Sequence, residues 1–336
     1  MSFIYIYGNN KFSMGSYSPS DVSEKVNAFL ESANCNNYLR YDEHNDVCYY
    51  SVFRANLLKK TAFSCDISKK LVSDSLFSSI PKNNIITTQA DAGITINKRG
   101  ECCFEHQTHK FMYIKPRDIF DHFDNWYSPN LKQEVGKIMP VPVGLYPLVA
   151  KELTPEFIQE LRNIPKTKLC YCNMSITSRY RAEIAKWANK CPWVDDFIFK
   201  RPDFVDKEYV NDPEIVFAEY ALDFKDYMRK LASYKFAIAP EGHGIDTFRI
   251  WECVITNTIP IASNNYGNRI FSQIFPMILT DRYETLKCPG FVNRRINEPS
   301  IVVKGDLADV NYDYELLKES NLHKLLGLIK NACNRA

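Results

Sequence analysis

The same arrangement of apolar and polar residues occurs twice in the second half of the chain. Residues 168–172 form a mostly apolar run that leads into a polar loop at 173–178, and a helix is expected through 181–188. The apolar run 236–239 is followed by the Pro- and Gly-marked loop 240–244 and by a second helical pattern. Two such units in succession predict a parallel sheet with helices on both faces, where ligands bind at the carboxyl ends of strands.

The rest of the chain also alternates between strand and helix patterns, which predicts the α/β class. Further strands are expected at 3–7, 84–88, 111–114, a short one within 138–145, and 259–262, and further helices at 22–33, 155–164 and 314–332. A polar, proline-marked passage near residue 150 suggests two domains, 1–150 and 151–336. Whether the last helix packs back onto the N-terminal domain is left open.

Composition and charge narrow the functional classes. The 336 residues are 45% hydrophobic and 24% charged, which is a normal balance for a protein with a sizeable core. The 42 basic and 40 acidic side chains nearly cancel. No global charge therefore favours nucleic acid or an anionic membrane as a partner, and any anion site must be local.

Cysteine usage and the N-terminus indicate a location. The 11 cysteines are scattered from Cys35 to Cys333 without a Cys-x-x-Cys motif, which is typical of reduced thiols in the cytosol. The apolar run 3–7 has no basic region before it and no cleavage pattern after it. No segment approaches the ~20 apolar residues of a membrane span. We expect a cytoplasmic protein without a transmembrane segment.

The loop at 240–244 carries the strongest chemical signal. Gly242 and Gly244 stand just before a helix, where free backbone N–H groups and the helix dipole favour an anion. Arg249 and Glu252 lie one turn apart on that helix. An arginine can bind a diphosphate through two N–H groups, and a carboxylate can accept hydrogen bonds from a ribose diol. The combination predicts a nucleotide-sugar site.

A dinucleotide-binding fold is the competing interpretation, since Gly242-x-Gly244 begins a Gly-x-Gly pattern. That fingerprint needs a third small residue where this chain has Thr247, and the motif stands late in the sequence. An oxidoreductase is therefore disfavoured.

Several ordered segments resemble the exostosin-like glycosyltransferases. They are residues 85–91, 126–130, 140–145, 172–181 and 240–252, so the resemblance covers about 80–285. It implies a GT-B fold, in which two Rossmann-like domains face a cleft, the second holding the nucleotide sugar and the first the acceptor. It also implies glycosyl transfer with inversion and without a dedicated metal. The resemblance suggests a uridine diphosphate sugar as donor and a glycan as acceptor.

The resemblance and the loop chemistry together nominate the site residues. Candidate donor ligands are Asn173, Ser175, Thr177, Arg181, Glu241, Gly242, His243, Gly244, Asp246, Arg249 and Glu252; acceptor ligands are Gln89 and Asn130; the general base is Asp91.

Each of these roles has an alternative that the sequence leaves open. Asp91 could instead be an aspartate that stabilises a turn. Glu101 and Glu105 are alternative candidates for the general base. Glu241 and Asp246 either contact the sugar or brace Arg249. Arg181 could instead pair with a surface carboxylate, and His243 could face solvent. The polar loop residues could instead cap a helix.

A cluster of potential metal ligands occurs at Cys102, Cys103, Glu105, His106 and His109, but its spacing matches no standard closed zinc site. We expect a polar loop there, no metal, and no cofactor beyond the nucleotide sugar as co-substrate. The function expected is a glycosyltransferase. The alternative is a non-catalytic nucleotide-sugar or glycan-binding module. The oligomeric state is left open.

Overall fold

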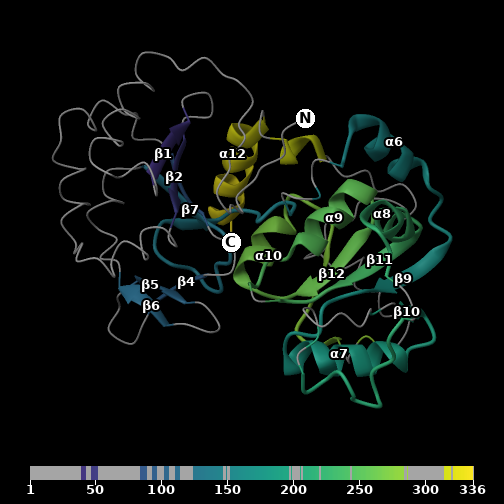
Figure 1. The fold of residues 1–336 in the computed structure, drawn as a ribbon. Helices are drawn as coiled ribbons and strands as arrows, with labels where there is room; N and C mark the ends of the chain where they lie inside the picture. The colour runs from purple at the N-terminus through teal and green to yellow at the C-terminus, as the bar shows by residue number, and fades with distance from the viewer. Residues whose placement is uncertain are drawn as a thin grey trace. The chain divides into compact units, whose positions relative to one another are not determined.

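The computed structural model describes 39–42, 47–51, 84–88, 93–96, 102–105, 110–113, 124–286 apart from 147–148, 150–151, 197, 199–204, 206, 219–220, 243 and 284–285, and 314–335 apart from 319–320. The chain divides into two compact units. One comprises Gly144–Leu316, and the other joins Ser2–Val143 to Leu317–Ala336. Each unit is described below by itself (Figure 1).

The unit Gly144–Leu316 is built on a sheet of parallel strands in the order β10-β9-β11-β12-β13. The strands are β9 (Lys168–Cys172), β10 (Val194–Asp196), β11 (Tyr234–Ala239), β12 (Ile259–Ser263) and β13 (Ile278–Thr280). In chain order the arrangement is 2-1-3-4-5, a doubly wound sheet whose direction of winding reverses between β9 and β11. The predicted α/β class and parallel sheet are confirmed.

Helices cover both faces of this sheet. They are α6 (Pro155–Asn163), α7 (Arg179–Asn189), α8 (Phe224–Ala232), α9 (Phe248–Thr256) and α10 (Tyr266–Phe271). Helices α6, α8 and α9 pack against one another, and Figure 1 shows α8 and α9 on one face of the sheet with α7 on the other. The alternation of strand and helix along this part of the chain dictates the arrangement, because parallel neighbours need a crossover.

Helix α9 lies deepest in this unit. All residues from Ile250 to Thr256 are buried, which suits the apolar character of the helix on nearly every side. The helix ends at Asn257, whose φ of 59° lies in the left-handed region that asparagine tolerates better than most residues. Helix α9 follows β11 after the loop 240–247, so its first turn lies near the carboxyl end of β11.

The second unit contains a sheet with strand order β1-β2-β3-β7-β8, and a separate antiparallel sheet β4-β5-β6. The bounds are β1 (Leu39–Asp42), β2 (Val47–Ser51), β3 (Asn84–Thr88), β4 (Gly93–Ile96), β5 (Cys102–Glu105), β6 (Lys110–Tyr113), β7 (Asn125–Ser128) and β8 (Ile138–Pro140). Helix α12 (Leu322–Cys333) packs on β8, and the hydroxyl of Tyr127 donates to the carbonyl of Leu326 at 3.2 Å.

Two expected elements differ from the structure. The continuous helix predicted at 314–332 is wrong, because a 3-10 turn, η3 (Tyr314–Leu317), precedes α12 as a separate element. Ser320 and Asn321 stand between them in the sequence, and both residue types favour helix ends over helix interiors. The polar loop expected at 102–105 is also wrong, since these residues form β5 between β4 and β6. The strand expected at 3–7 and the helix at 22–33 lie outside the described residues.

No helix among the described residues is long and apolar enough to cross a membrane. Within the same residues Cys170, Cys191 and Cys253 are free thiols.

Lys166 forms hydrogen bonds at the C-terminal end of α9, and its burial leads us to expect that the stability of the protein depends on pH. Its Nζ donates to the carbonyl of Thr256 at 2.7 Å and to the hydroxyl of Thr258 at 2.8 Å. Burial lowers the pKa of Lys166 from 10.5 to about 7. Between these two values the unfolded chain binds a proton that the folded protein does not. The free energy of unfolding therefore rises with pH across this window, by at most about 1.4 kcal/mol per pH unit.

We expect Lys166→Met to lose this rise. Chemical denaturation at several pH values between 7 and 10 measures it as the difference between the two stability curves. Lys190→Met removes an exposed positive charge and serves as the control. Parallel curves for wild type and Lys166→Met would contradict the prediction.

Candidate functional site

The predicted donor residues lie in two loops at one edge of the parallel sheet. Residues 173–178 follow β9, and residues 240–247 follow β11. Since β9 and β11 are neighbours at which the winding reverses, both loops start at the place where doubly wound sheets bind ligands.

Arg181, in the first turn of α7, ties these two loops together. Its Nε donates to the carbonyl of Glu241 at 2.8 Å, its Nη1 to that of Ser175 at 3.0 Å, and its Nη2 to that of Pro240 at 3.4 Å. Among the described residues it forms no ion pair with a carboxylate. Burial lowers the pKa of Arg181 to about 10, and the nearby positive charge of Arg249 contributes in the same direction. Arg181 therefore acts first as a clamp between the loops.

The clamp explains the need for glycine at position 242. A Cβ on Gly242 would lie 2.6 Å from Nη2 of Arg181, so any side chain would displace the guanidinium from its carbonyl partners. The N–H of Gly242 donates to the carbonyl of Gly244 at 2.8 Å. The prediction that this N–H points freely at an anion is therefore wrong, because the loop itself uses it.

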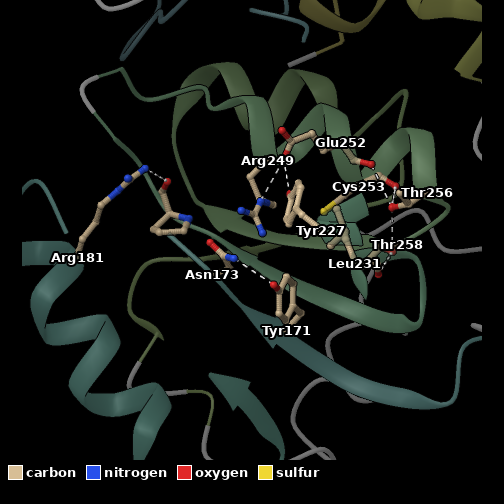
Figure 2. Close-up of polar contacts among 11 residues, drawn as sticks. Tyr171, Asn173, Arg181, Tyr227, Leu231, Arg249, Glu252, Cys253, Thr256 and Thr258 are labelled. Atoms are coloured by element: carbon tan, nitrogen blue, oxygen red, sulfur yellow. Dashed lines mark hydrogen bonds and ion pairs between the residues drawn. The ribbon is translucent and has the colours of Figure 1, made fainter. Parts of the chain in front are cut away.

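Arg249, Glu252 and Tyr227 form the polar cluster at the start of α9 (Figure 2). Nε of Arg249 lies 3.3 Å from Oε2 of Glu252, and the two side chains are only 15% and 12% exposed. The ion pair lacks the angle of a hydrogen bond, since this Nε has no hydrogen-bond partner. The hydroxyl of Tyr227, from α8, donates to the same Oε2 at 2.5 Å. Both predicted ligands on α9 are thus present together, held by a third residue.

Two tyrosine rings lie near the guanidinium of Arg249. Its Cζ lies 4.8 Å from the ring centre of Tyr227 and 5.9 Å from that of Tyr171 on β9. Asn173 donates through Nδ2 to the hydroxyl of Tyr171 at 3.0 Å, which links the loop after β9 to the same group. Cation–π attraction compensates in part for the burial of the charge.

Unsatisfied polar atoms gather at the N-terminus of α9. The side chains of Thr154, Ser178, Asp223 and Asn265 cap α6, α7, α8 and α10, but Thr247 makes no such bond to α9. The hydroxyl of Thr247 and Nη1 of Arg249 are buried and have no hydrogen-bond partner among the described residues. Buried donors without partners are rare and call for an explanation, of which a ligand is one.

The two other acidic candidates are engaged elsewhere. Both oxygens of Asp246 accept from the indole N–H of Trp251, at 2.9 and 3.1 Å, and Asp246 is only 7% exposed. Oε1 of Glu241 accepts from Nδ2 of Asn265 at 3.2 Å. Asp246 therefore braces Trp251, a contact that was not predicted from the sequence.

The remaining candidates divide between placed and undescribed residues. Thr177 is half-buried in the loop after β9, directly before the capping residue Ser178. Asn130 follows β7, is 3% exposed and has a φ of 59°, so it also serves the turn there. Gln89, Asp91 and His243 lie outside the described residues, as do His106 and His109. No group of three potential metal ligands occurs within the part of the chain that the structure describes.

Tyr227 is the functional candidate that sequence reasoning missed. Helix α8 carries Phe224, Met228 and Leu231 on its apolar face, with Tyr227 next to them. The sequence did contain a signal for Tyr227, because its hydroxyl lies on the packing face of α8, the helix before β11. Consecutive right-handed crossovers place α8 and α9 on the same face of the sheet, where they pack together.

Neither a scan against protein-family models nor a search of curated proteins finds a match. Among solved structures the chain is similar to HepE from Anabaena in complex with UDP, with 11% identity, a TM-score of 0.38, and 95% of each chain covered. It is also similar to a glycosyltransferase from Rickettsia africae ESF-5, with 13% identity, a TM-score of 0.37, and 96% of this chain and 85% of that one covered. Sucrose-phosphate synthase from Thermosynechococcus elongatus has 11% identity and a TM-score of 0.36, with 95% and 78% covered.

Proposed function

We propose that the chain is a GT-B glycosyltransferase that moves a sugar from a nucleoside diphosphate donor, a uridine one by resemblance, to a glycan hydroxyl. One observation carries the proposal. At the reversal point of a doubly wound sheet, the uncapped N-terminus of α9 holds two buried donors without partners, the hydroxyl of Thr247 and Nη1 of Arg249. A diphosphate supplies the acceptors that these atoms lack.

The same geometry suits the departure of a diphosphate. As the bond from the sugar to the leaving group breaks, negative charge grows on the phosphate, and Arg249 stabilises it in a poorly solvated site. Glu252 offers Oε1, which accepts no hydrogen bond from the described residues, to the ribose diol. Arg181 holds the loops after β9 and β11 in place through its hydrogen bonds to their carbonyl groups. Transfer with inversion and without a metal, Asp91 as general base, and Gln89 and Asn130 as acceptor ligands belong to the same proposal, as does a cytoplasmic location.

Thermal unfolding with the diphosphates of uridine, guanosine, cytidine and adenosine, and with UDP-glucose, tests the donor site. We expect one series to stabilise the protein, by about 2.7 kcal/mol at 100 times its Kd. Thr247→Val should raise the stability of the ligand-free protein by up to about 1 kcal/mol, because an unpartnered buried hydroxyl disappears. The same change should reduce the stabilisation by ligand.

Thr256→Val is a matched control at the other end of α9. The hydroxyl of Thr256 is buried, like that of Thr247, but lies 3.0 Å from the carbonyl of Glu252, to which it donates. Its removal should lower the stability and leave the effect of ligand unchanged. The proposal fails if no nucleotide stabilises wild type, or if Thr247→Val leaves the stabilisation by nucleotide intact.

A further inference from the structure

We propose that Tyr227 is a positioning residue that makes the candidate donor site selective for a ribose diol. The inference rests on the proposed function and adds to it a residue from a different helix. Tyr227 touches both charged members of the site, because its hydroxyl donates to Oε2 of Glu252 and its ring lies against the guanidinium of Arg249.

The hydroxyl of Tyr227 decides which oxygen of Glu252 faces a ligand. Oε2 receives both the Tyr227 hydroxyl, at 2.5 Å, and the positive charge of Arg249, at 3.3 Å. Oε1 takes no hydrogen bond from the described residues, so it is the oxygen left for a ligand. Burial raises the pKa of the Tyr227 phenol well above its usual range, and the hydroxyl therefore remains a donor. A carboxylate held at one oxygen presents the other in a fixed direction.

The ring of Tyr227 has a second effect, on Arg249. The guanidinium lies within 4.8 Å of the ring centre of Tyr227 and 5.9 Å of that of Tyr171, and this packing restricts its rotation. Its Nη1 then has a fixed position at the start of α9, where the proposed diphosphate binds. Tyr227 thus orients the ligand for the ribose through its hydroxyl and the ligand for the phosphate through its ring.

These two contributions predict different effects on different ligands. Removing only the hydroxyl takes away the hydrogen bond that orients Glu252 and leaves the ring beside Arg249, so the loss should be confined to ligands that carry a ribose 2′-hydroxyl. A purely structural role for Tyr227 would weaken all ligands alike or only lower the stability. The ratio of affinities for a ribose and a 2′-deoxyribose ligand is therefore a readout that a structural role leaves unchanged.

The experiment is calorimetric titration of the full chain with UDP, 2′-deoxy-UDP and inorganic pyrophosphate. In wild type, UDP should bind about 10-fold more tightly than 2′-deoxy-UDP, the value of one hydrogen bond to a charged group. In Tyr227→Phe this preference should fall to within about twofold, while pyrophosphate binding changes by less than about twofold. In Tyr227→Leu the affinity for pyrophosphate should also fall.

Tyr234→Phe is a matched control. The hydroxyl of Tyr234 donates to a carboxylate of Asp195 at 2.6 Å, but Tyr234 stands at the first residue of β11, the end of the strand away from the site. It should leave the UDP preference intact. If wild type binds none of the three ligands, the proposed function and this inference both fall. If wild type prefers UDP and Tyr227→Phe keeps that preference, or if the phenylalanine variant loses pyrophosphate as strongly as UDP, only the positioning role is overturned.

Discussion

Replacing Arg249 by methionine is expected to lower the free energy of unfolding by about 3–5 kcal/mol, because it leaves the Glu252 carboxylate buried without its counter-charge. The pair is almost fully enclosed, with 15% and 12% of the two side chains exposed, so water cannot take over the role of the arginine. The hydrogen bond from Tyr227 to Glu252 remains in this variant, so we expect a loss near the lower end of that range. Chemical denaturation with a constant m-value measures the change.

A double-mutant cycle separates the ion pair from the size of the side chain. Glu252→Gln alone leaves a buried positive charge, whereas the double variant Arg249→Met with Glu252→Gln leaves neither charge. The double variant should therefore lose clearly less stability than the sum of the single variants. The single variant Arg249→Met should also lose the stabilisation by nucleotide, whereas a purely structural arginine would leave that stabilisation unchanged. A loss below about 1 kcal/mol for Arg249→Met would mean that the pair is hydrated in solution.

The elements that sequence patterns predicted well are those whose signals are local. The strand at 168–172 matches β9 residue for residue, because a short apolar run lies between two breaker segments. Thr154 and Pro155 likewise marked the start of α6, where the Thr154 hydroxyl accepts from the N–H of Phe157 at 3.2 Å. In both cases neighbours in the sequence supply the determining interaction.

The elements that sequence patterns missed depend on distant residues. Strand β10 has only three residues, Val194–Asp196, two of them aspartates, and it forms because it pairs in parallel with β9. Aspartate is depleted in strands, so the composition of β10 gives little strand signal. The sheet β4-β5-β6 is another case, since the pairing of β5 with its two neighbours overrides its resemblance to a polar loop.

The candidate site shows the same division. The spacing of Arg249 and Glu252 on one helix predicted their contact, because residues three apart share a helix face. The contribution of Tyr227 comes from another helix, and only the packing of α8 on α9 places it there. Asp246 was assigned to the ligand or to Arg249, yet it bonds to Trp251 within the first turns of α9.

Trp251→Leu is expected to be as destabilising as the loss of Arg249, at about 3–5 kcal/mol. The indole is fully buried and packs edge-on against Phe271, at 5.2 Å between ring centres, and Phe275, at 5.5 Å. Leucine leaves a cavity between these rings. It also lacks the indole N–H that donates hydrogen bonds to both oxygens of Asp246. Because Asp246 directly precedes the N-terminus of α9, we also expect weaker nucleotide binding by the folded variant.

Two further variants separate the cavity from the loss of the brace. Phe271→Leu reduces the packing on Trp251 without touching Asp246, so it should lower the stability and leave nucleotide affinity within about twofold. Asp246→Asn keeps an oxygen that accepts from the indole, and it should cost less than about 1 kcal/mol and preserve nucleotide binding. If Asp246→Asn instead weakens UDP-glucose binding much more than UDP binding, Asp246 contacts the sugar directly. The hydrogen bond from Trp251 would then hold Asp246 in position for the ligand.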